Sequence, residues 1–143
     1  MAAQAIIDPP CCMCSFARGR EEKEFTALEG MPGGSIKLMR EMPTSALTRC
    51  KAGSLEPGHH HTFGHDAVVI KGRLTVWNLT KGEKYDLGPG DYWFTPARDV
   101  HRVKYYEDTE LFIKWDGLWD FFIDEDRDAA NAAIDAEKNA AAP

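Results

Sequence analysis

Short hydrophobic runs rich in β-branched and aromatic residues recur between Ser35 and Asp124, and Gly, Pro and Asp residues separate them. The breaks come about every 8–12 residues, which is the spacing expected of an all-β sandwich or barrel. Nine strands are expected, at Ile36–Glu41, Ala46–Lys51, His59–His61, Ala67–Lys71, Arg73–Leu79, Lys84–Leu87, Tyr92–Thr95, His101–Tyr106 and Leu111–Trp115. Because glycine accepts positive φ, Lys71-Gly72 between two of these runs predicts a tight hairpin.

The two ends of the chain depart from this alternation. Residues 1–34 are rich in Pro, Gly and charge, and we expect an irregular N-terminal arm with at most one short strand. Residues 35–123 then form a single β-barrel, because 143 residues suffice for one core and not two. Residues 124–143 are Ala-rich, acidic at their start and basic at Lys138, which predicts a short helix. Ile134 is its one apolar anchor, so a disordered tail is the alternative.

Composition narrows the class of partner. The net charge is −6, the pI is near 5.3, and the Lys and Arg residues are scattered, so no basic face for nucleic acid is expected. No hydrophobic run approaches the length of a membrane span. A small molecule is therefore the expected partner. The N-terminus lacks the basic segment and the following apolar segment of a signal peptide, which predicts a cytoplasmic protein. If a leader has been removed, a secreted or periplasmic protein is the alternative.

Four cysteines are unevenly placed, with Cys11, Cys12 and Cys14 together and Cys50 alone. The Cys-Cys-x-Cys run lacks the C-x2-C pairs of structural zinc sites. Reduced thiols of an intracellular protein are the favoured interpretation, and a metal or redox cluster is the alternative.

The five histidines carry the clearest chemistry. His59, His60, His61 and His65 fall within seven residues, and His101 follows at the start of another expected strand. Alternate side chains of a strand share a face, so His59 and His61 point one way and His60 the other. If the shared face is the barrel interior, His59, His61, His65 and His101 converge, and we predict that these four bind one metal ion.

The spacing around these histidines resembles the two motifs of the cupin superfamily. The first runs Gly53, five residues, His59-x-His61, three residues, His65, six residues, Gly72, and the second runs Gly90, five residues, Pro96, four residues, His101. The resemblance covers roughly residues 45–116 and implies a single jelly-roll β-barrel with a divalent metal inside its mouth. The histidine-only set and Lys71-Gly72-Arg73 are loosely similar to small single-domain cupins of the acetylacetone-cleaving dioxygenase type.

One departure from the cupin pattern changes the predicted metal site. His65 stands where the first motif usually has Glu, although the adjacent Asp66 offers a carboxylate. A neutral shell of four histidines leaves the full +2 charge on the ion, which favours an anionic or enolisable partner. Imidazole ligands suit Fe(II), which we favour, and also Mn, Co, Ni, Cu or Zn.

Three further residues are candidates for catalysis. Glu56 and Tyr105 are placed to serve as proton-transfer groups near the metal, and Arg98 to bind an anionic substrate at the mouth. For each of them, an ordinary surface or core role is the alternative.

Together these features favour a metal-dependent enzyme, in first place an Fe(II)-dependent dioxygenase that acts on a small enolisable or phenolic compound. A metal-assisted lyase, isomerase or cyclase acting on a small acid is the rival within enzymes. A non-catalytic barrel that binds a metal or ligand is the alternative outside them. Edge strands suggest a homodimer.

Overall fold

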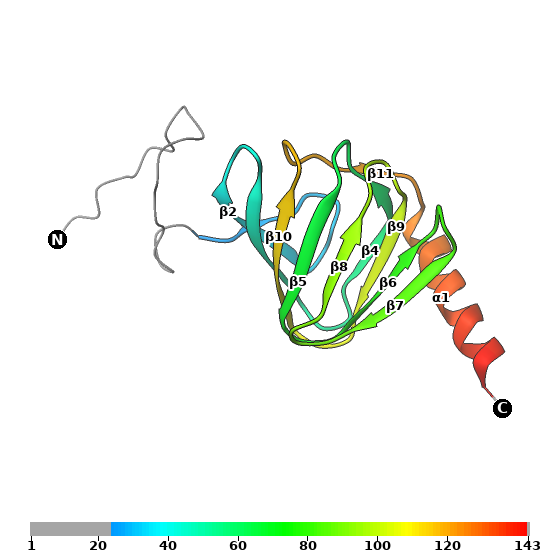
Figure 1. Ribbon diagram of the computed structural model, residues 1–143. Helices are drawn as coiled ribbons and strands as arrows, with labels where there is room; N and C mark the ends of the chain where they lie inside the picture. The colour runs from blue at the N-terminus through cyan, green and yellow to red at the C-terminus, as the bar shows by residue number, and fades with distance from the viewer. Residues whose placement is uncertain (1–23, 143) are drawn as a thin grey trace.

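Two antiparallel sheets face each other in the computed structural model, which describes residues 24–142 (Figure 1). The first sheet has the order β1 (Thr26–Ala27), β2 (Gly34–Arg40), β3 (Ser45–Cys50), β10 (Thr109–Trp115), β5 (His65–Lys71), β8 (Tyr92–Thr95). The second has the order β11 (Phe122–Ile123), β4 (Leu55–His60), β9 (His101–Tyr105), β6 (Leu74–Asn78), β7 (Glu83–Leu87). This confirms the all-β class and the jelly-roll barrel expected from the sequence.

All nine expected strands are present, with small differences in their bounds. The largest difference is β4, which begins at Leu55 although the hydrophobic pattern starts only at His59. Pro57 and Gly58 interrupt the pattern, and the register of β4 against β9 shifts between Glu56 and His59 at this point. A bulge of this kind re-aims the side chains that follow it.

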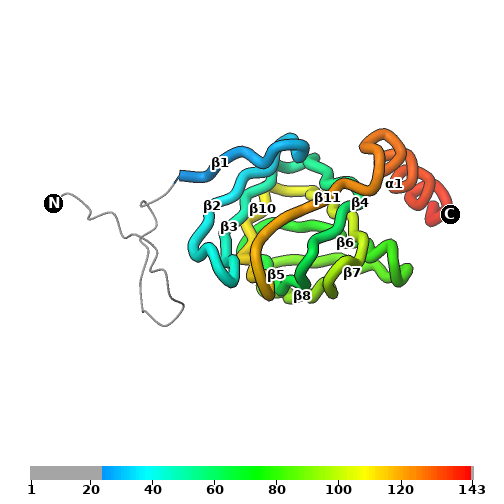
Figure 2. The backbone as a smooth tube through the Cα atoms, turned by 90° about the horizontal axis from the view of Figure 1, so that it is seen from above, coloured from blue at the N-terminus to red at the C-terminus, as the bar shows by residue number. Residues whose placement is uncertain are grey.

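The segments flanking the expected barrel also contribute to it. β1 lies in the expected N-terminal arm and pairs with β2, whereas β11 pairs with β4. β1 and β11 have two residues each, which is too short for a hydrophobic pattern to reveal them in the sequence. After β10 the chain crosses one end of the barrel, passes beside β4 as β11 and continues to the C-terminal helix (Figure 2).

The hairpin predicted at Lys71-Gly72 is wrong. β5 belongs to the first sheet and β6 to the second, so this turn carries the chain from one sheet to the other. Gly72 does adopt the positive φ that was expected, 93°. The turn residues alone cannot distinguish a hairpin from a crossing between facing sheets, because both require the same backbone conformation.

Alternation along each strand directs one set of side chains into a common core. In β10, Leu111, Ile113 and Trp115 are buried, while Phe112 and Lys114 between them are exposed. The same period of two brings Val76 and Val103 inward from the second sheet. Any polar residue at such an inward position is therefore held between the sheets.

The C-terminal segment forms the helix α1 (Arg127–Ala141), as expected, in place of a disordered tail. The Asp126 side chain accepts hydrogen bonds from the N–H groups of Asp128 and Ala129, which satisfies donors at the start of the helix. Ala130 and Ile134 pack in a cluster with Leu55 and Trp77. Within residues 24–142, no helix has the length and apolar character to cross a membrane.

Candidate metal centre

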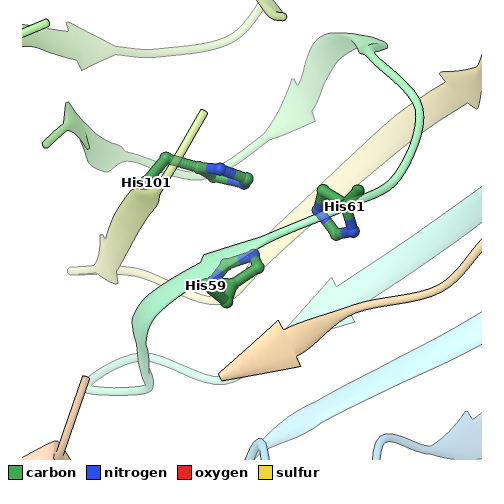
Figure 3. Close-up of side chains that lie close together, drawn as sticks. All are labelled: His59, His61 and His101. Atoms are coloured by element: carbon green, nitrogen blue, oxygen red, sulfur yellow. The ribbon is translucent and has the colours of Figure 1, made fainter. Parts of the chain in front are cut away.

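Three histidines meet at one end of the barrel core. His59 lies near the end of β4, His61 follows that strand, and His101 is the first residue of β9, paired in register with His59. One ring nitrogen of each lies within 4.8 Å of the others. The three side chains project toward a common space from neighbouring segments (Figure 3). They are 2%, 7% and 2% exposed, so the cluster is held away from bulk water.

The hydrogen bonds of these rings fix which nitrogen carries the proton. Nδ1 of His59 lies 2.8 Å from the Pro57 carbonyl oxygen, and Nδ1 of His101 lies 3.1 Å from that of Asp99. Nδ1 of His61 is hydrogen-bonded to the Asp120 carbonyl oxygen. A carbonyl oxygen can only accept, so each Nδ1 bears the hydrogen and each Nε2 keeps a free lone pair.

This arrangement matches what a divalent metal requires. Ligand histidines normally donate their second ring N–H to a carbonyl or carboxylate, which orients the ring and increases the basicity of the other nitrogen. Here all three donate to backbone carbonyls, and Asp120 is itself held by the backbone N–H of Thr62 at 2.9 Å and by the Thr62 hydroxyl at 2.6 Å. The donor set and its orientation therefore fit a divalent transition metal.

His65, the fourth predicted ligand, lies in the same cavity but differs from the other three. It is the first residue of β5 and 3% exposed, and its ring centroid is 4.8 Å from that of His61 and 5.2 Å from that of His101. Its Nδ1 is buried and has no hydrogen-bond partner among the described residues. Its orientation is thus not fixed by a carbonyl, and ligation by His65 stays a prediction.

The residues beside the predicted ligands point outward. Asp66 accepts a hydrogen bond from the Tyr92 hydroxyl on the outer face of the first sheet, so the idea that it replaces the usual Glu ligand is wrong. The reason is strand alternation, since His65 next to it points inward. His60, as expected, faces away from His59 and His61, forms a 2.6 Å hydrogen bond to Asp124 and stacks on Phe122.

Burial keeps the histidines of the cavity neutral. Loss of solvation lowers the pKa of both His59 and His61 to about 4. The same cause, with repulsion from the neighbouring histidines, lowers the pKa of His65 and His101 well below 6.5. Neutral imidazoles are the form that binds metals, so the cavity presents ligands at neutral pH without first losing protons.

These pKa shifts predict acid sensitivity of the metal-free protein. Unfolded histidines take up protons below about pH 6.5, whereas folded His59 and His61 resist protonation down to about pH 4. The unfolded state therefore binds more protons in this window, and the free energy of unfolding falls as the pH falls. Between pH 7.5 and pH 5 we expect a loss on the order of 2 kcal/mol for each such histidine.

Urea unfolding of the metal-free protein at the two pH values measures this loss. His60→Gln is the matched control, because His60 lies outside the cavity, and it should retain most of the loss, since burial is the main cause of the low pKa of His59. His59→Gln should reduce the loss, and an undiminished loss in that variant would contradict the assignment.

Glu56 and Tyr105, two of the predicted catalytic residues, form a pair in the cavity. The Glu56 carboxylate oxygen Oε2 lies 3.8 Å from His59 Nε2, and Oε1 accepts a 2.9 Å hydrogen bond from the Tyr105 hydroxyl. Burial raises the pKa of Glu56 above its usual value and that of Tyr105 well above its own. A carboxyl with a raised pKa is suited to exchange protons near neutral pH.

Cys50 completes this network, since its thiol contacts the same Glu56 oxygen at 3.8 Å and burial raises the thiol pKa. It is a free, buried cysteine. A raised pKa keeps the sulfur protonated and unreactive, which agrees with a reduced thiol. Cys11, Cys12 and Cys14 lie outside the described residues.

Arg98, the third predicted catalytic residue, is exposed in the loop between β8 and β9 and does not line the cavity. It has a φ of 66°, and its backbone N–H donates a 2.9 Å hydrogen bond to the His61 carbonyl oxygen. The structure thus gives its backbone a part in holding His61. A contact of its guanidinium with an anionic substrate stays a prediction.

The cavity around these groups is small, about 40 Å³. Besides the four histidines, Glu56 and Tyr105, aromatic side chains form much of its wall: Trp93, Trp115, Trp119 and Phe121. The carbonyls that orient the histidines were not anticipated from the sequence. The carbonyls leave no trace in residue type, whereas the inward position of Trp93 follows from strand alternation.

Comparison with known proteins adds family relationships. Residues 46–115 match the Cupin domain family. The chain is 63% identical over 127 residues to the "DNA damage-repair/toleration protein DRT102" of Arabidopsis thaliana. That alignment covers 89% of this chain and 40% of the relative, so the chain spans less than half of the relative's length.

Solved structures share the fold at low sequence identity. The polyketide cyclase RemF of Streptomyces resistomycificus superimposes with a TM-score of 0.66 at 13% identity, covering 85% of this chain and 94% of its own. KdgF of Halomonas sp. gives 0.58 at 22% identity, covering 67% and 90%. Salicylate 1,2-dioxygenase of Pseudoaminobacter salicylatoxidans gives 0.53 at 19% identity, covering 59% and 25%. At such identities the likeness concerns the fold alone.

Proposed function

The chain belongs to the cupin superfamily, and on that basis we propose that it is a metal-dependent enzyme that acts on a small enolisable or phenolic compound. One observation carries the proposal. His59, His61 and His101 direct lone pairs into a buried space, and the Glu56 carboxylate lies beside them in the same cavity. Metal ligands and a proton-transfer group within one closed site are the parts that such chemistry needs.

Fe(II)-dependent oxygenolysis is the reaction we favour. His59, His61 and His101 would hold the ion, with His65 as a further ligand. When bound, the ion supplies Lewis acidity and, as Fe(II), reactivity toward dioxygen. Its neutral histidine shell cancels none of the ion's charge, which favours a substrate that binds as an anion.

The remaining steps fall to the chain's own side chains. Glu56 is placed to take a proton from the substrate, and the Tyr105 hydroxyl orients its carboxylate. Trp115, Trp119 and Phe121 cover the cavity with apolar surface. Exclusion of water strengthens the interactions within the site and protects reactive species from hydrolysis.

A metal-assisted lyase, isomerase or cyclase is the second candidate, and Glu56 also supports it. These reactions need a proton-transfer group within reach of the metal, and Glu56 Oε2 lies 3.8 Å from His59 Nε2. They proceed without oxygen, which separates them from the first candidate. A non-catalytic metal- or ligand-binding barrel is the third candidate.

Oxygen uptake tests the proposal directly. Protein loaded with Fe(II) under anaerobic conditions and then exposed to oxygen is expected to consume it when acetylacetone or catechol is added. Glu56→Gln keeps the shape of the side chain and should lower turnover by about 10²–10⁴-fold, the usual contribution of a general base, with metal content unchanged.

Each other outcome assigns the protein to another candidate. Conversion of added compounds without oxygen uptake would favour the lyase, isomerase or cyclase. Tightly held zinc, indifferent to added ligands and without turnover, would favour the non-catalytic barrel. Product analysis by mass spectrometry and metal analysis of the same samples distinguish these cases.

A further inference from the structure

Four buried polar side-chain atoms lack a hydrogen-bond partner among the described residues, and all four belong to the wall of one cavity. They are Thr48 Oγ1, His65 Nδ1, Trp93 Nε1 and Trp115 Nε1. Their residues are between 2% and 7% exposed. Buried polar atoms are nearly always paired in folded proteins, because an unpaired one has lost its hydrogen bonds to water without a replacement. Their concentration in the candidate site therefore indicates that something else pairs with them.

The two tryptophans define the chemistry of the missing partner. An indole N–H can only donate, so Trp93 and Trp115 both require an acceptor. Glu56, the one carboxylate that the described residues contribute to the cavity wall, already accepts from Tyr105 and Cys50. The Thr48 hydroxyl can donate a third hydrogen bond. The wall thus offers donors to a ligand that brings its own acceptor atoms.

Trp93 and Trp115 lie on the sheet opposite to His59 and His101, and on the same sheet as His65. Trp115 on β10 is paired in register with His65, and Trp93 on β8 is paired with Ala67 of the same neighbouring strand β5. His59 and His101 belong to the facing sheet. The ring centroids of Trp115 and His61 are 5.9 Å apart. A ligand in the cavity therefore lies between His59 and His101 on one sheet and the two tryptophans with His65 on the other.

The size of the cavity limits the group that fits. A volume of about 40 Å³ leaves room for a small group and not for a bulky one. A carboxylate, or the O–C–C segment of an enolate, has this size. Both carry negative charge on oxygen and accept hydrogen bonds strongly.

We propose that Trp93 and Trp115, with Thr48, form an oxyanion-binding subsite that receives a carboxylate or enolate oxygen in the histidine cavity. The proposal rests on the proposed function in one respect, the presence of a metal opposite the subsite. The unpaired donors are observed whether or not a metal binds. It deepens the proposed function by naming the charged oxygen group through which a substrate is held.

Indole N–H resonances provide the test, because the chain has four tryptophans and each gives one signal. Addition of acetate or of the acetylacetone anion to the ¹⁵N-labelled protein, with and without Zn(II), is expected to shift the Trp93 and Trp115 signals. Trp77 donates to Glu137 at 2.7 Å and is a built-in control whose signal should not move. Trp93→Phe and Trp115→Phe assign the signals and remove one indole donor each while keeping an aromatic ring.

The affinity for the anion should fall about 10–100-fold in each of these variants, since a hydrogen bond to a charged group contributes about 1.5–3 kcal/mol. Trp77→Phe, which lies outside this cavity and removes an indole that donates to Glu137, should leave the affinity unchanged. Absence of any shift in the wild type would overturn the subsite and indicate that water pairs with the indoles. The subsite would also be overturned if a variant carrying both Trp93→Phe and Trp115→Phe bound the anion as tightly as the wild type.

Metal content of the same samples keeps the two proposals apart. Anion-induced shifts in a protein that binds no metal would sink the proposed function and leave the subsite standing. Normal metal binding without the shifts would overturn the subsite and leave the proposed function standing.

Discussion

Replacement of His101 by alanine is expected to lower the affinity for a divalent metal by about 100-fold or more. Structural sites with four ligands bind Zn²⁺ with about 10–16 kcal/mol, so one ligand accounts for about 3 kcal/mol. His101 is buried and its Nδ1 contacts a carbonyl, which leaves Nε2 for the ion. Competition titration with a chelating dye measures the change.

His60→Ala is the matched control for this experiment. It removes the imidazole that lies between His59 and His61 in the sequence but faces outward onto Asp124 and Phe122. Its metal affinity should equal that of the wild type. Equal losses in both variants would mean that the effect comes from disturbing the paired strands β4 and β9 rather than from a ligand. His65→Ala in the same titration decides whether three or four histidines bind the ion.

Gly72→Ala is expected to destabilise the protein by about 3 kcal/mol or more, through two separate causes. The residue has a φ of 93°, which strains any side chain, typically by about 1–3 kcal/mol. A Cβ atom there would also lie 2.4 Å from Thr109 Oγ1 and 2.6 Å from the Asp108 carbonyl oxygen. The second of these is backbone, so the contact cannot be relieved by a side-chain rotation.

Gly53→Ala separates the two causes. Gly53 has nearly the same φ, 87°, and no atom lies within 4 Å of the point that an alanine Cβ would occupy. This variant should therefore show the backbone strain alone, about 1–2 kcal/mol. Urea unfolding at neutral pH gives both values. If the two variants lose equal stability, Asp108 and Thr109 at the start of β10 move aside, and the close approach at Gly72 is not a constraint.

Much of the fold and part of the site could be predicted from the sequence because both depend on strand alternation. The period of two located the strands and placed His59 and His61 on one face with His60 on the other. It could also have excluded Asp66 as a ligand, had the inward position of His65 been applied to its neighbour. Which of the two sheets each strand joins was harder to predict, as the wrong hairpin at Lys71-Gly72 illustrates.

The features that orient the site could not be predicted, because they depend on contacts between distant segments. The carbonyl of Asp120 reaches His61 only because the segment after β10 crosses the end of the barrel. The lack of partners for the Trp93 and Trp115 indoles among the described residues is a property of the whole cavity wall. No residue pattern records either.

A homodimer stays a prediction.

The pairing of His59 with His101 has a consequence for the order of folding. β4 and β9 are far apart in the sequence, and β3 likewise pairs with the distant β10. Closing such long loops costs entropy before any contact compensates for it, which makes topologies of this kind slow to fold. His101 joins His59 and His61 only when the non-local pairing of β4 with β9 has formed. A metal ion would therefore find all its ligands only in an already folded barrel.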